Sequence, residues 1–520
     1  MNILLDVNVV VDICSKREPF YIKALEIMDW LDLNSISTRL YAGSVQTYQY
    51  ILMSELISRD KKNNEKKSIA FYEEESKKLL SSFTQDLVWV SALSEDGSVF
   101  TDEDPEDAQL IKAVNRMGED SFLLTRDKQL LKRFNKAISP DKFIKKYIES
   151  EVEWQKSIPF CDLKKQLDEY RSEMESAISQ VVESTSFING PTVKTLAEEL
   201  SSFSGVKHSI PCASGTDALL LALMTLDVQP GDEIIVPAFT FIASGSMVSF
   251  YKAVPVFADV DPVTFNINPE EIKKKITSKT VGIIPVSLYG QCAQMDEINK
   301  IAAENNIWVI EDAAQSFGAD YKDKKSCNLS TLATTSFFPA KPLGCYGDGG
   351  AVFTNDDTLA DKVRLYANHG QAKRYYHSEI GINGRMDSIQ AAVVSTKLKH
   401  FNDEIDARNK AAAMYTERLK GIVKTPEVLS FNRSTWAQYT IRSEKRDLIR
   451  EKLGEKDIPS AIHYPMPLPR QEAFSCLKQN DSFPVSDMLS EQVMSLPMHS
   501  FITIEEIDFI CNSIKESLNG

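Results

Sequence analysis

Short apolar runs alternate with helical patterns through the middle of the chain, and this alternation restricts the fold more than any other feature. A strand followed by a helix and another strand is the unit from which parallel sheets are built. The sequence therefore predicts an α/β fold with a mostly parallel sheet and helices on both faces. Six runs have the length and composition of buried strands: Glu233–Pro237, Val254–Phe257, Val281–Pro285, Ile307–Ile310, Thr334–Phe338 and Ala351–Thr354.

The pattern changes on both sides of this region. A long charged helix is expected over Asp403–Leu419, and shorter elements follow it, which indicates a smaller C-terminal subdomain over residues 401–520. At the other end, the apolar run Ile3–Leu5 and a strand pattern at Phe122–Asp127 indicate a separate α/β domain. The 520 residues are too many for one ordinary domain. We expect domains over residues 1–150 and 157–520, and the larger part of the second over 157–400.

One lysine lies in an unusual sequence environment. Lys341 follows Thr335–Ala340 and precedes Pro342–Gly350, and these flanks are small, apolar and glycine-rich as far as Asp348. Burial in such a turn lowers the pKa of a lysine and makes its amine nucleophilic, so that it can form a Schiff base with pyridoxal phosphate. The alternative interpretations are a buried lysine paired with an acid and a surface loop.

Two further stretches contain groups that such a cofactor needs. The run Asn306–Ser316 begins as a buried strand and ends in acidic and amide side chains, at the end of the strand where open α/β sheets bind ligands. Asp312 is the candidate for the carboxylate that faces a pyridinium nitrogen. The run Cys212–Leu219 opens a helix with small residues, whose backbone N–H groups can hold a phosphate.

These stretches occur together, and in order, in a known family. Residues from about 160 to the end resemble the DegT/DnrJ/EryC1/StrS sugar aminotransferases, which are fold-type I enzymes that use pyridoxal phosphate. Within that family, the runs Ser336–Gly350 and Gln492–His499 are most similar to the UDP-2-acetamido-2-deoxy-ribo-hexuluronate aminotransferases. The other segments that carry the resemblance are Phe187–Pro191, Ala213–Leu219, Pro237–Phe241, Pro285–Gln291, Glu311–Ser316 and Asn383–Asp387.

The resemblance implies roles for individual residues around the cofactor. Lys341 is then the residue that binds the cofactor and moves the substrate proton, Asp312 faces the pyridine nitrogen, and Gln315 lies near the ring hydroxyl. Because one phosphate contact comes from the neighbouring subunit in this family, the resemblance also implies a homodimer with shared active sites. The remaining implied contacts are Phe241 on the ring face, Gly215, Thr216 and Ser336 at the phosphate, and Asn383 at the phosphate of the neighbouring subunit.

The same resemblance implies the reaction and the residues that bind the substrate. It predicts transfer of an amino group from L-glutamate to C3 of a UDP-linked keto-hexuronate, for surface polysaccharide such as an O-antigen. Arg385, His463 and Tyr464 match positions that face the sugar nucleotide. The alternatives are a surface salt bridge for Arg385 and core positions for His463 and for Phe241. Amination at C4 of another sugar also stays open, whereas the sugar dehydratases of this fold carry histidine in place of Lys341.

The order of motifs in residues 1–150 resembles a PIN domain, the fold of metal-dependent ribonucleases. By that resemblance, Asp6, Asp107 and Asp127 match acids that bind Mg²⁺ or Mn²⁺, and Asn8 and Asp12 match polar positions of the first motif. On spacing alone, the interpretation of these acids as helix caps and solvated side chains is favoured over a metal site.

One acid that PIN nucleases carry after the second strand has no counterpart here. Amides and a threonine occupy the corresponding stretch, Ser44–Leu52. Loss of one carboxylate weakens metal binding and misplaces the attacking water, so we expect weak or no ribonuclease activity. A ribonuclease toxin or RNA-binding regulator, with the aminotransferase part as a scaffold, is the rival interpretation of the whole chain.

Composition narrows the remaining classes of function. The formal net charge of −15 argues against a general nucleic-acid-binding surface. Eight cysteines are scattered without a CxxC pair, which is typical of a reduced cytoplasmic protein and not of a disulfide framework or zinc site. No apolar run is long enough to span a bilayer, and we expect no membrane association.

Overall fold

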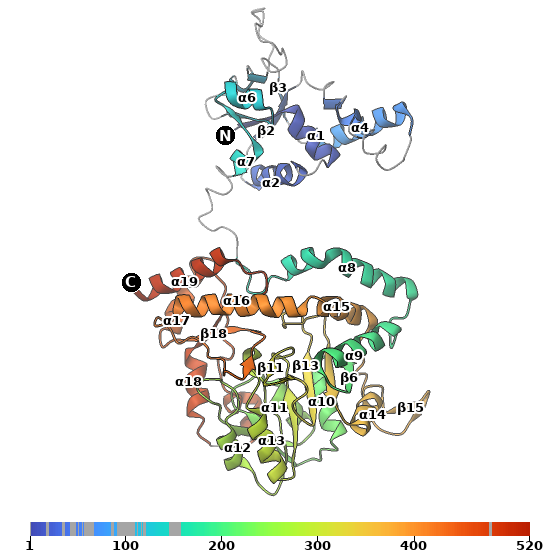
Figure 1. Cartoon of the computed structure of the whole chain (residues 1–520), viewed down its shortest axis with the longest axis vertical. Helices are drawn as coiled ribbons and strands as arrows, with labels where there is room; N and C mark the ends of the chain where they lie inside the picture. The colour runs from blue at the N-terminus through green and yellow to red at the C-terminus, as the bar shows by residue number, and fades with distance from the viewer. Residues whose placement is uncertain are drawn as a thin grey trace, which may run out of the picture. The chain divides into compact units, whose positions relative to one another are not determined.

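The chain forms two compact units, Met1–Lys156 and Ser157–Gly520, in a computed structural model (Figure 1). The structure describes residues 2–16, 20–33, 37–41, 48–49, 51–54, 56, 67–84, 88–90, 110–111, 113–115, 117, 121–144, 158–477 and 481–519. Among the helices within these ranges, none has the length and apolar character that a bilayer crossing requires.

The N-terminal unit is built on a five-stranded parallel sheet of order β3-β2-β1-β4-β5. Apolar side chains from the central strand β1 and from the helix that follows it, such as Ile3, Val9 and Val10, are buried together in its core. The described elements are β1 (Asn2–Leu5), α1 (Val7–Ser15), α2 (Phe20–Leu33), β2 (Ser37–Tyr41), α4 (Ile69–Thr84), β3 (Val88–Val90), β4 (Ser121–Leu124), α6 (Lys128–Arg133), β5 (Ala137–Ile138) and α7 (Pro140–Phe143).

The second unit is built on a seven-stranded sheet of order β6-β14-β13-β10-β9-β7-β8. The expected mostly parallel α/β sheet is confirmed, with one strand reversed, because β14 runs antiparallel to both β6 and β13. No helix separates β13 from β14, so the chain returns directly beside the strand it has just left. The strands are β6 (His208–Cys212), β7 (Glu233–Pro237), β8 (Val254–Ala258), β9 (Thr280–Ile283), β10 (Trp308–Asp312), β13 (Leu332–Ser336) and β14 (Gly350–Thr354).

Consecutive residues of these strands bury opposite faces of the sheet. Leu332 and Val352 pack with helices α10, α11 and α14, whereas Ala333 and Phe353 pack with α8, α9 and α15. This alternation is the two-residue period of a strand that is covered on both sides. The helices are α8 (Leu163–Ser184), α9 (Pro191–Ser204), α10 (Gly215–Thr225), α11 (Ala243–Phe250), α12 (Pro269–Lys275), α13 (Met295–Glu304), α14 (Asp357–Tyr366) and α15 (Ser388–Leu398).

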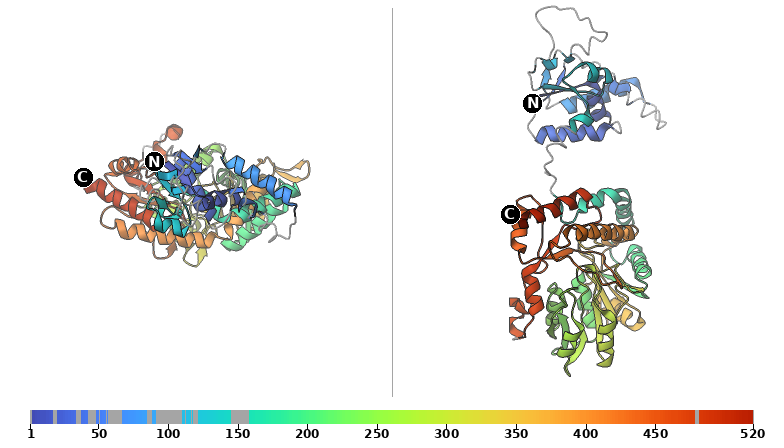
Figure 2. Two further views of the ribbon diagram at one scale, coloured as in Figure 1. Left: turned by 90° about the horizontal axis from the view of Figure 1, so that it is seen from above. Right: turned by 60° about the vertical axis from the view of Figure 1, so that its left-hand side comes forward.

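The last part of the chain has the smaller elements that the sequence predicts. The long helix α16 (Phe401–Leu419) lies beside α19 (Ile504–Asn519), as both views of Figure 2 also show. β18 (Tyr439–Arg442) pairs antiparallel with β19 (Val493–Leu496), and Tyr439 of β18 stacks on Tyr415 of α16. The remaining elements are β11 (Asp320–Tyr321), β12 (Lys324–Lys325), β15 (Gln371–Lys373), β16 (Tyr376–His377), β17 (Asn432–Arg433), α17 (Arg446–Gly454), α18 (Pro484–Gln492) and the short 3-10 helices Leu288–Gly290, Leu468–Arg470 and Glu472–Leu477.

Candidate active site

Residues that the sequence separates widely meet where the central strands of the larger sheet end. Asp312 is the last residue of β10 and pairs with Thr334 of β13. Ser336 ends β13 opposite Gly350 of β14, and Gly350 pairs in turn with Cys212 at the end of β6. These pairings bring the ends of β10, β13 and β6 and the start of β14 together, at the carboxyl ends of the parallel strands, where open α/β sheets bind their ligands.

Lys341 lies in the connection between β13 and β14, which leaves the sheet at this end. Its backbone N–H donates to the carbonyl of Phe338 at 2.8 Å, and the loop is closed where Cys345 N–H donates to the carbonyl of Phe337 at 2.8 Å. The turn needs a glycine, because a Cβ at Gly344 would lie 2.4 Å from the carbonyl oxygen of Pro339. Burial lowers the pKa of Lys341, and the charge of Asp312 opposes that shift.

Asp312 is buried and both of its carboxylate oxygens are held. Oδ2 accepts a hydrogen bond from Ser244 Oγ at 2.8 Å, and Oδ1 accepts one from the backbone N–H of Ala314 at 3.1 Å. Burial raises the pKa of Asp312, while these two hydrogen bonds and the charge of Lys341 lower it. The site thus pairs a buried amine with a buried carboxylate whose orientation is restricted.

The start of α10 lies against the end of β13. A Cβ at Gly215 would lie 2.7 Å from Ser336 Cβ, and a Cβ at Gly350 would lie 2.7 Å from the backbone nitrogen of Gly215. Ser214 caps the helix, and its Oγ accepts from the N–H of Asp217 at 3.0 Å. The first-turn N–H groups of a helix have no acceptor within the helix. Gly215, Thr216 and Ser336 Oγ therefore form a place that can hold a phosphate.

Gln315 and Tyr464 form one side of the site. Gln315 Oε1 accepts from the backbone N–H of Tyr289 at 2.7 Å, and its Nε2 donates to the hydroxyl of Tyr464 at 3.1 Å. The ring of Phe241 lies 6.1 Å from that of Tyr464, and the residue is 53% exposed, so a ligand can reach it. Phe241 is therefore not a core residue, and the core alternative for it is wrong.

His463 lies next to Tyr464 and is held by Ser495. The distance between His463 Nδ1 and Ser495 Oγ is 2.9 Å. Burial, with a smaller contribution from the charge of Lys341, lowers the pKa of His463 to about 4. The imidazole is therefore neutral at physiological pH and has one nitrogen left to face a ligand.

Two of the expected site residues lie elsewhere in the single chain. Asn383 and Arg385 run beside the outer edge of β6, where the N–H of Ala213 donates to the carbonyl of Gly384 at 3.0 Å. Arg385 Nη1 donates to Asn368 Oδ1 at 2.7 Å, and its Nε is buried without a partner among the described residues. Asn383 is thus exposed and Arg385 partly buried on a strip, residues 383–385, that runs along β6, the outermost strand of the sheet.

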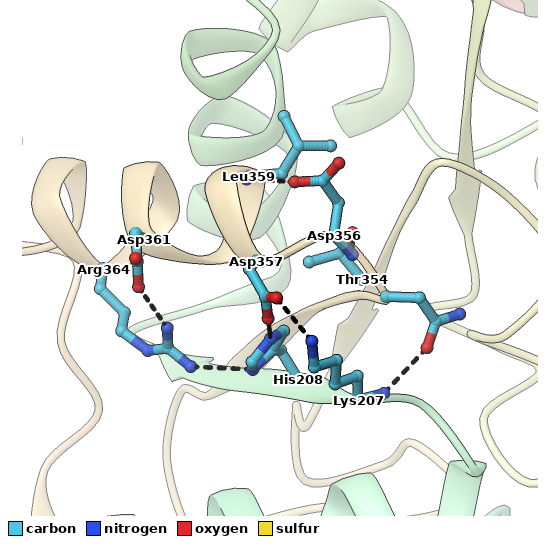
Figure 3. Close-up of polar contacts among 9 residues, drawn as sticks. Lys207, His208, Thr354, Asp356, Asp357, Leu359, Asp361 and Arg364 are labelled. Carbon is cyan, nitrogen blue, oxygen red and sulfur yellow. Dashed lines mark hydrogen bonds and ion pairs between the residues drawn. The ribbon is translucent and has the colours of Figure 1, made fainter.

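Arg385 lines a cavity of about 710 Å³ that follows this edge between α9 and α14. Lys207, His208 and Arg364 also line it, and Figure 3 shows their polar contacts with neighbouring residues. His208 Nε2 lies 2.6 Å from Asp357 Oδ1, and Arg364 Nη1 donates to Asp361 Oδ1 at 2.8 Å. His208 and Arg364 at this end of the cavity thus have acidic partners, whereas the Nε of Arg385 has none in the part of the chain that the structure describes.

One residue of the site carries no signal in the sequence. Ser244 lies in the first turn of α11, and its hydroxyl reaches a carboxylate that is 68 residues away along the chain. A serine near the start of a helix is ordinary in itself. Only the proximity of α11 to the end of β10 identifies it.

In the N-terminal unit, Asp6 and Asp127 lie close together but already act as helix caps. Asp6 accepts from Val7 N–H at 2.7 Å and from Thr125 Oγ1 at 2.6 Å, and Asp127 Oδ1 accepts from Gln129 N–H at 2.6 Å. Burial is the main cause that raises the pKa of Asp6, and the charge of Asp127 adds to it.

The other acids of this unit give no metal site among the residues that the structure describes. Asp12 forms an ion pair with Arg126, whose Nε lies 2.7 Å from Asp12 Oδ2, and Asn8 donates to Asp6 at 3.4 Å. Asp107 lies outside the described residues, as do most of Ser44–Leu52. Within the described ranges, no three His, Cys, Asp or Glu side chains are grouped to hold a metal ion.

Comparisons with known proteins find a match for each of the two units. The family model described as the DegT/DnrJ/EryC1/StrS aminotransferase family matches residues 168–515, and a PIN-domain model matches residues 2–129. The UDP-2-acetamido-2-deoxy-3-oxo-D-glucuronate aminotransferase of Pseudomonas aeruginosa is 48% identical over 358 residues, which are 69% of this chain and 99% of that protein.

Two further relatives cover the same region. The UDP-N-acetyl-3-dehydro-alpha-D-glucosamine 3-aminotransferase of Acidithiobacillus ferrooxidans is 39% identical and covers 70% of this chain and 99% of its own length. The crystal structure of a DegT DnrJ EryC1 StrS aminotransferase from Brucella abortus is 42% identical, with a TM-score of 0.67, and covers 69% of this chain and 98% of its own.

Proposed function

This chain belongs to the DegT/DnrJ/EryC1/StrS aminotransferase family of pyridoxal-phosphate-dependent nucleotide-sugar aminotransferases, and we propose that it transfers an amino group from L-glutamate to UDP-2-acetamido-2-deoxy-ribo-hex-3-uluronate. The product is the corresponding 3-amino sugar, for surface polysaccharide biosynthesis. The observation that carries the proposal is the buried amine of Lys341, in the connection after β13, within range of the charge of buried Asp312 at the end of β10, in a chain with this family membership.

The residues of the site fit pyridoxal phosphate. Lys341 Nζ would bind its aldehyde carbon, Asp312 would face the pyridine nitrogen, and the Gly215–Ser336 contact leaves a cradle at a helix N-terminus for the phosphate. When bound, the cofactor supplies an electron sink for the carbon that loses its proton. Thr216 would add a phosphate contact, Gln315 would donate to the ring hydroxyl, and Phe241 would cover one ring face.

Lys341 also has the properties of the group that moves protons in this reaction. Its amine is buried, and burial lowers its pKa, so that a larger fraction is neutral than for an exposed lysine. A neutral amine can take a proton from the α-carbon of glutamate and deliver one to C3 of the sugar. His463 and Tyr464 would line the sugar-nucleotide side, where the pKa of His463, lowered to about 4, keeps it an uncharged hydrogen-bonding group.

The choice of a hexuronate rests on the names of relatives and on one arginine. The 48% identical relative is named for a 3-oxo-glucuronate, and the 39% identical relative for a neutral 3-dehydro-glucosamine. A sugar carboxylate in a closed site needs a cationic partner, because burial of an unpaired charge is costly. Arg385 is the candidate for that role, because its Nε is buried and has no hydrogen-bond partner among the residues that the structure describes.

Arg385 and Asn383 would act on the site of a second copy of the chain, so we also propose a homodimer with shared active sites. Both residues lie on the strip 383–385, which runs along β6, the outermost strand of the sheet. Large apolar side chains close to this strip are exposed. Ile188, which is 54% exposed, pairs with Asp387, just after this strip. An exposed apolar surface beside an incomplete site is the expected appearance of a subunit interface.

The test is an acceptor panel with purified full-length protein, pyridoxal phosphate and glutamate. We expect 2-oxoglutarate to form with the UDP-linked 3-keto-hexuronate, and no turnover with Lys341→Ala. The neutral UDP-linked 3-keto-N-acetylglucosamine is the matched acceptor, in which a hydroxymethyl group replaces the carboxylate. A preference for a neutral 4-keto sugar would overturn the substrate and leave the aminotransferase assignment intact.

A further inference from the structure

Ser244 holds the carboxylate that faces the site from the end of β10. Its Oγ donates to Asp312 Oδ2 at 2.8 Å, and the exposed fractions of the two side chains are 1% and 5%. The other carboxylate oxygen accepts from the Ala314 N–H at 3.1 Å. A hydroxyl from α11 and an amide from the chain after β10 thus fix the rotation of the carboxylate from two sides.

We propose that Ser244 is a positioning residue that keeps the pyridine nitrogen of the bound cofactor protonated by orienting and stabilising the Asp312 carboxylate. The proposal rests on the proposed contact between Asp312 and that nitrogen. Ser244 itself does not touch the reacting atoms.

The location of one proton, on the Asp312 carboxylate or on the ring nitrogen, decides how well the bound cofactor accepts electrons. Asp312 is buried, and burial favours its neutral form. Hydrogen bonds to the charged form oppose this, and the bond from Ser244 is the first among them. If it is removed, the carboxylate becomes more basic and takes a larger share of the proton that it shares with the ring nitrogen. A less protonated ring is a poorer electron sink, so proton removal from glutamate becomes slower.

The chain offers a matched control on the same helix. Ser246 lies two residues after Ser244 in α11, and its Oγ donates to the carbonyl of Ala243 at 3.4 Å. Ser246→Ala removes a hydroxyl from the same turn without touching Asp312. Ser244→Thr keeps the hydroxyl, and Ser244→Cys keeps nearly the volume of serine with a much weaker donor.

The experiment loads full-length protein and each variant with pyridoxal phosphate labelled with ¹⁵N in the ring and records the ¹⁵N resonance. In Ser244→Ala we expect this resonance to move toward the position of an unprotonated pyridine. The rate of the first half-reaction with glutamate should fall by about 10- to 100-fold, the range for one hydrogen bond to a charged group. Ser244→Thr should stay near the wild type, and Ser246→Ala should not change either quantity.

The variant Asp312→Asn tests separately whether Asp312 is the partner of the ring nitrogen, as the site assignment requires, and whether Ser244 acts on Asp312. If Asp312→Asn moves the resonance but Ser244→Ala does not, Ser244 has only a packing role and the inference is wrong. If neither change moves it, Asp312 is not the partner of the ring nitrogen, and the assignment beneath the inference fails. If Ser244→Ala does not fold, the same comparison is made with Ser244→Cys, in which an unmoved resonance again contradicts the proposal.

Discussion

Gly215 and Ser336 pack so closely that no side chain fits between them. A Cβ on Gly215 would lie 2.7 Å from the Cβ of Ser336 and 3.2 Å from its Cα. The first residue of α10 is therefore in direct contact with the last residue of β13. This contact forms one side of the site that we assign to the cofactor phosphate.

Gly215→Ala should therefore weaken cofactor binding. The added methyl group must push Ser336 or the start of α10 away, because the contact would be shorter than real Cβ contacts. We expect the dissociation constant for pyridoxal phosphate to rise by at least about 10-fold, as for loss of one charge-assisted hydrogen bond. A fluorescence titration of apo protein measures it. Gly454→Ala, where a Cβ meets nothing within 4 Å, is the control.

A shared active site predicts rescue between two inactive variants. Asn383→Ala lacks the proposed cross-subunit phosphate contact, and Lys341→Ala lacks the amine. A hybrid dimer of the two contains one site with both residues intact, so it should recover part of the activity. Differently tagged subunits allow the hybrid to be purified before the assay. Purified hybrids that remain inactive would show that each chain completes its own site.

Arg385→Ala should discriminate between acceptors. Removing one partner of a buried charge pair costs about 2–4 kcal/mol in kcat/KM for the 3-keto-hexuronate. With the neutral 3-keto sugar the loss should be much smaller, because no charge is left unpaired. Arg364→Ala, which removes another arginine of the same cavity, should affect neither acceptor. Equal losses for both acceptors in Arg385→Ala would assign Arg385 to the diphosphate or to the fold.

Stability should fall in acid because of a buried histidine outside the active site. Burial is the main cause that lowers the pKa of His499 to about 4 from the ordinary value of 6.5. Between these values the unfolded chain binds a proton that the folded chain does not, so stability decreases as pH falls through this window and is retained above it. This group alone would contribute about 3 kcal/mol across the window.

His499→Gln should flatten that part of the stability curve. Urea unfolding at several pH values between 7 and 4 measures the slope, and His377→Gln, a change of an exposed histidine, is the control. The variant should lose less stability on acidification than the wild type, whatever its stability at pH 7. An unchanged slope would mean that His499 binds its proton equally well in both states.

The N-terminal unit should be dispensable for transamination and a poor ribonuclease. A chain that starts at Lys156 should fold and retain the activity, because the compact units divide there. In the full chain, Asp6 and Asp127 are engaged as helix caps and Asp12 is paired with Arg126, so we expect little Mn²⁺-dependent cleavage of RNA. Robust cleavage that is lost in Asp6→Ala would reverse this view and support the rival function of the chain.

The sequence by itself determined the fold class and the chemistry that the chain can perform. Alternating strand and helix patterns are local, since they depend on which residues within a few positions are apolar, and they predicted the covered sheet. The setting of Lys341 and the acid at the end of β10 are also local features. Together with the resemblance of whole segments, they pointed to a pyridoxal phosphate enzyme, and the family is confirmed.

Only the tertiary structure decided how distant segments meet. The hydrogen bond from Ser244 to Asp312, the contact of Gly215 with Ser336 and the ion pair of Asp12 with Arg126 each join residues more than sixty positions apart. The reversed direction of β14 and the position of Arg385 along the outermost strand β6 are likewise consequences of strand pairing. Such contacts arise from the packing of whole elements against one another. A local sequence pattern does not indicate which other element will pack beside it.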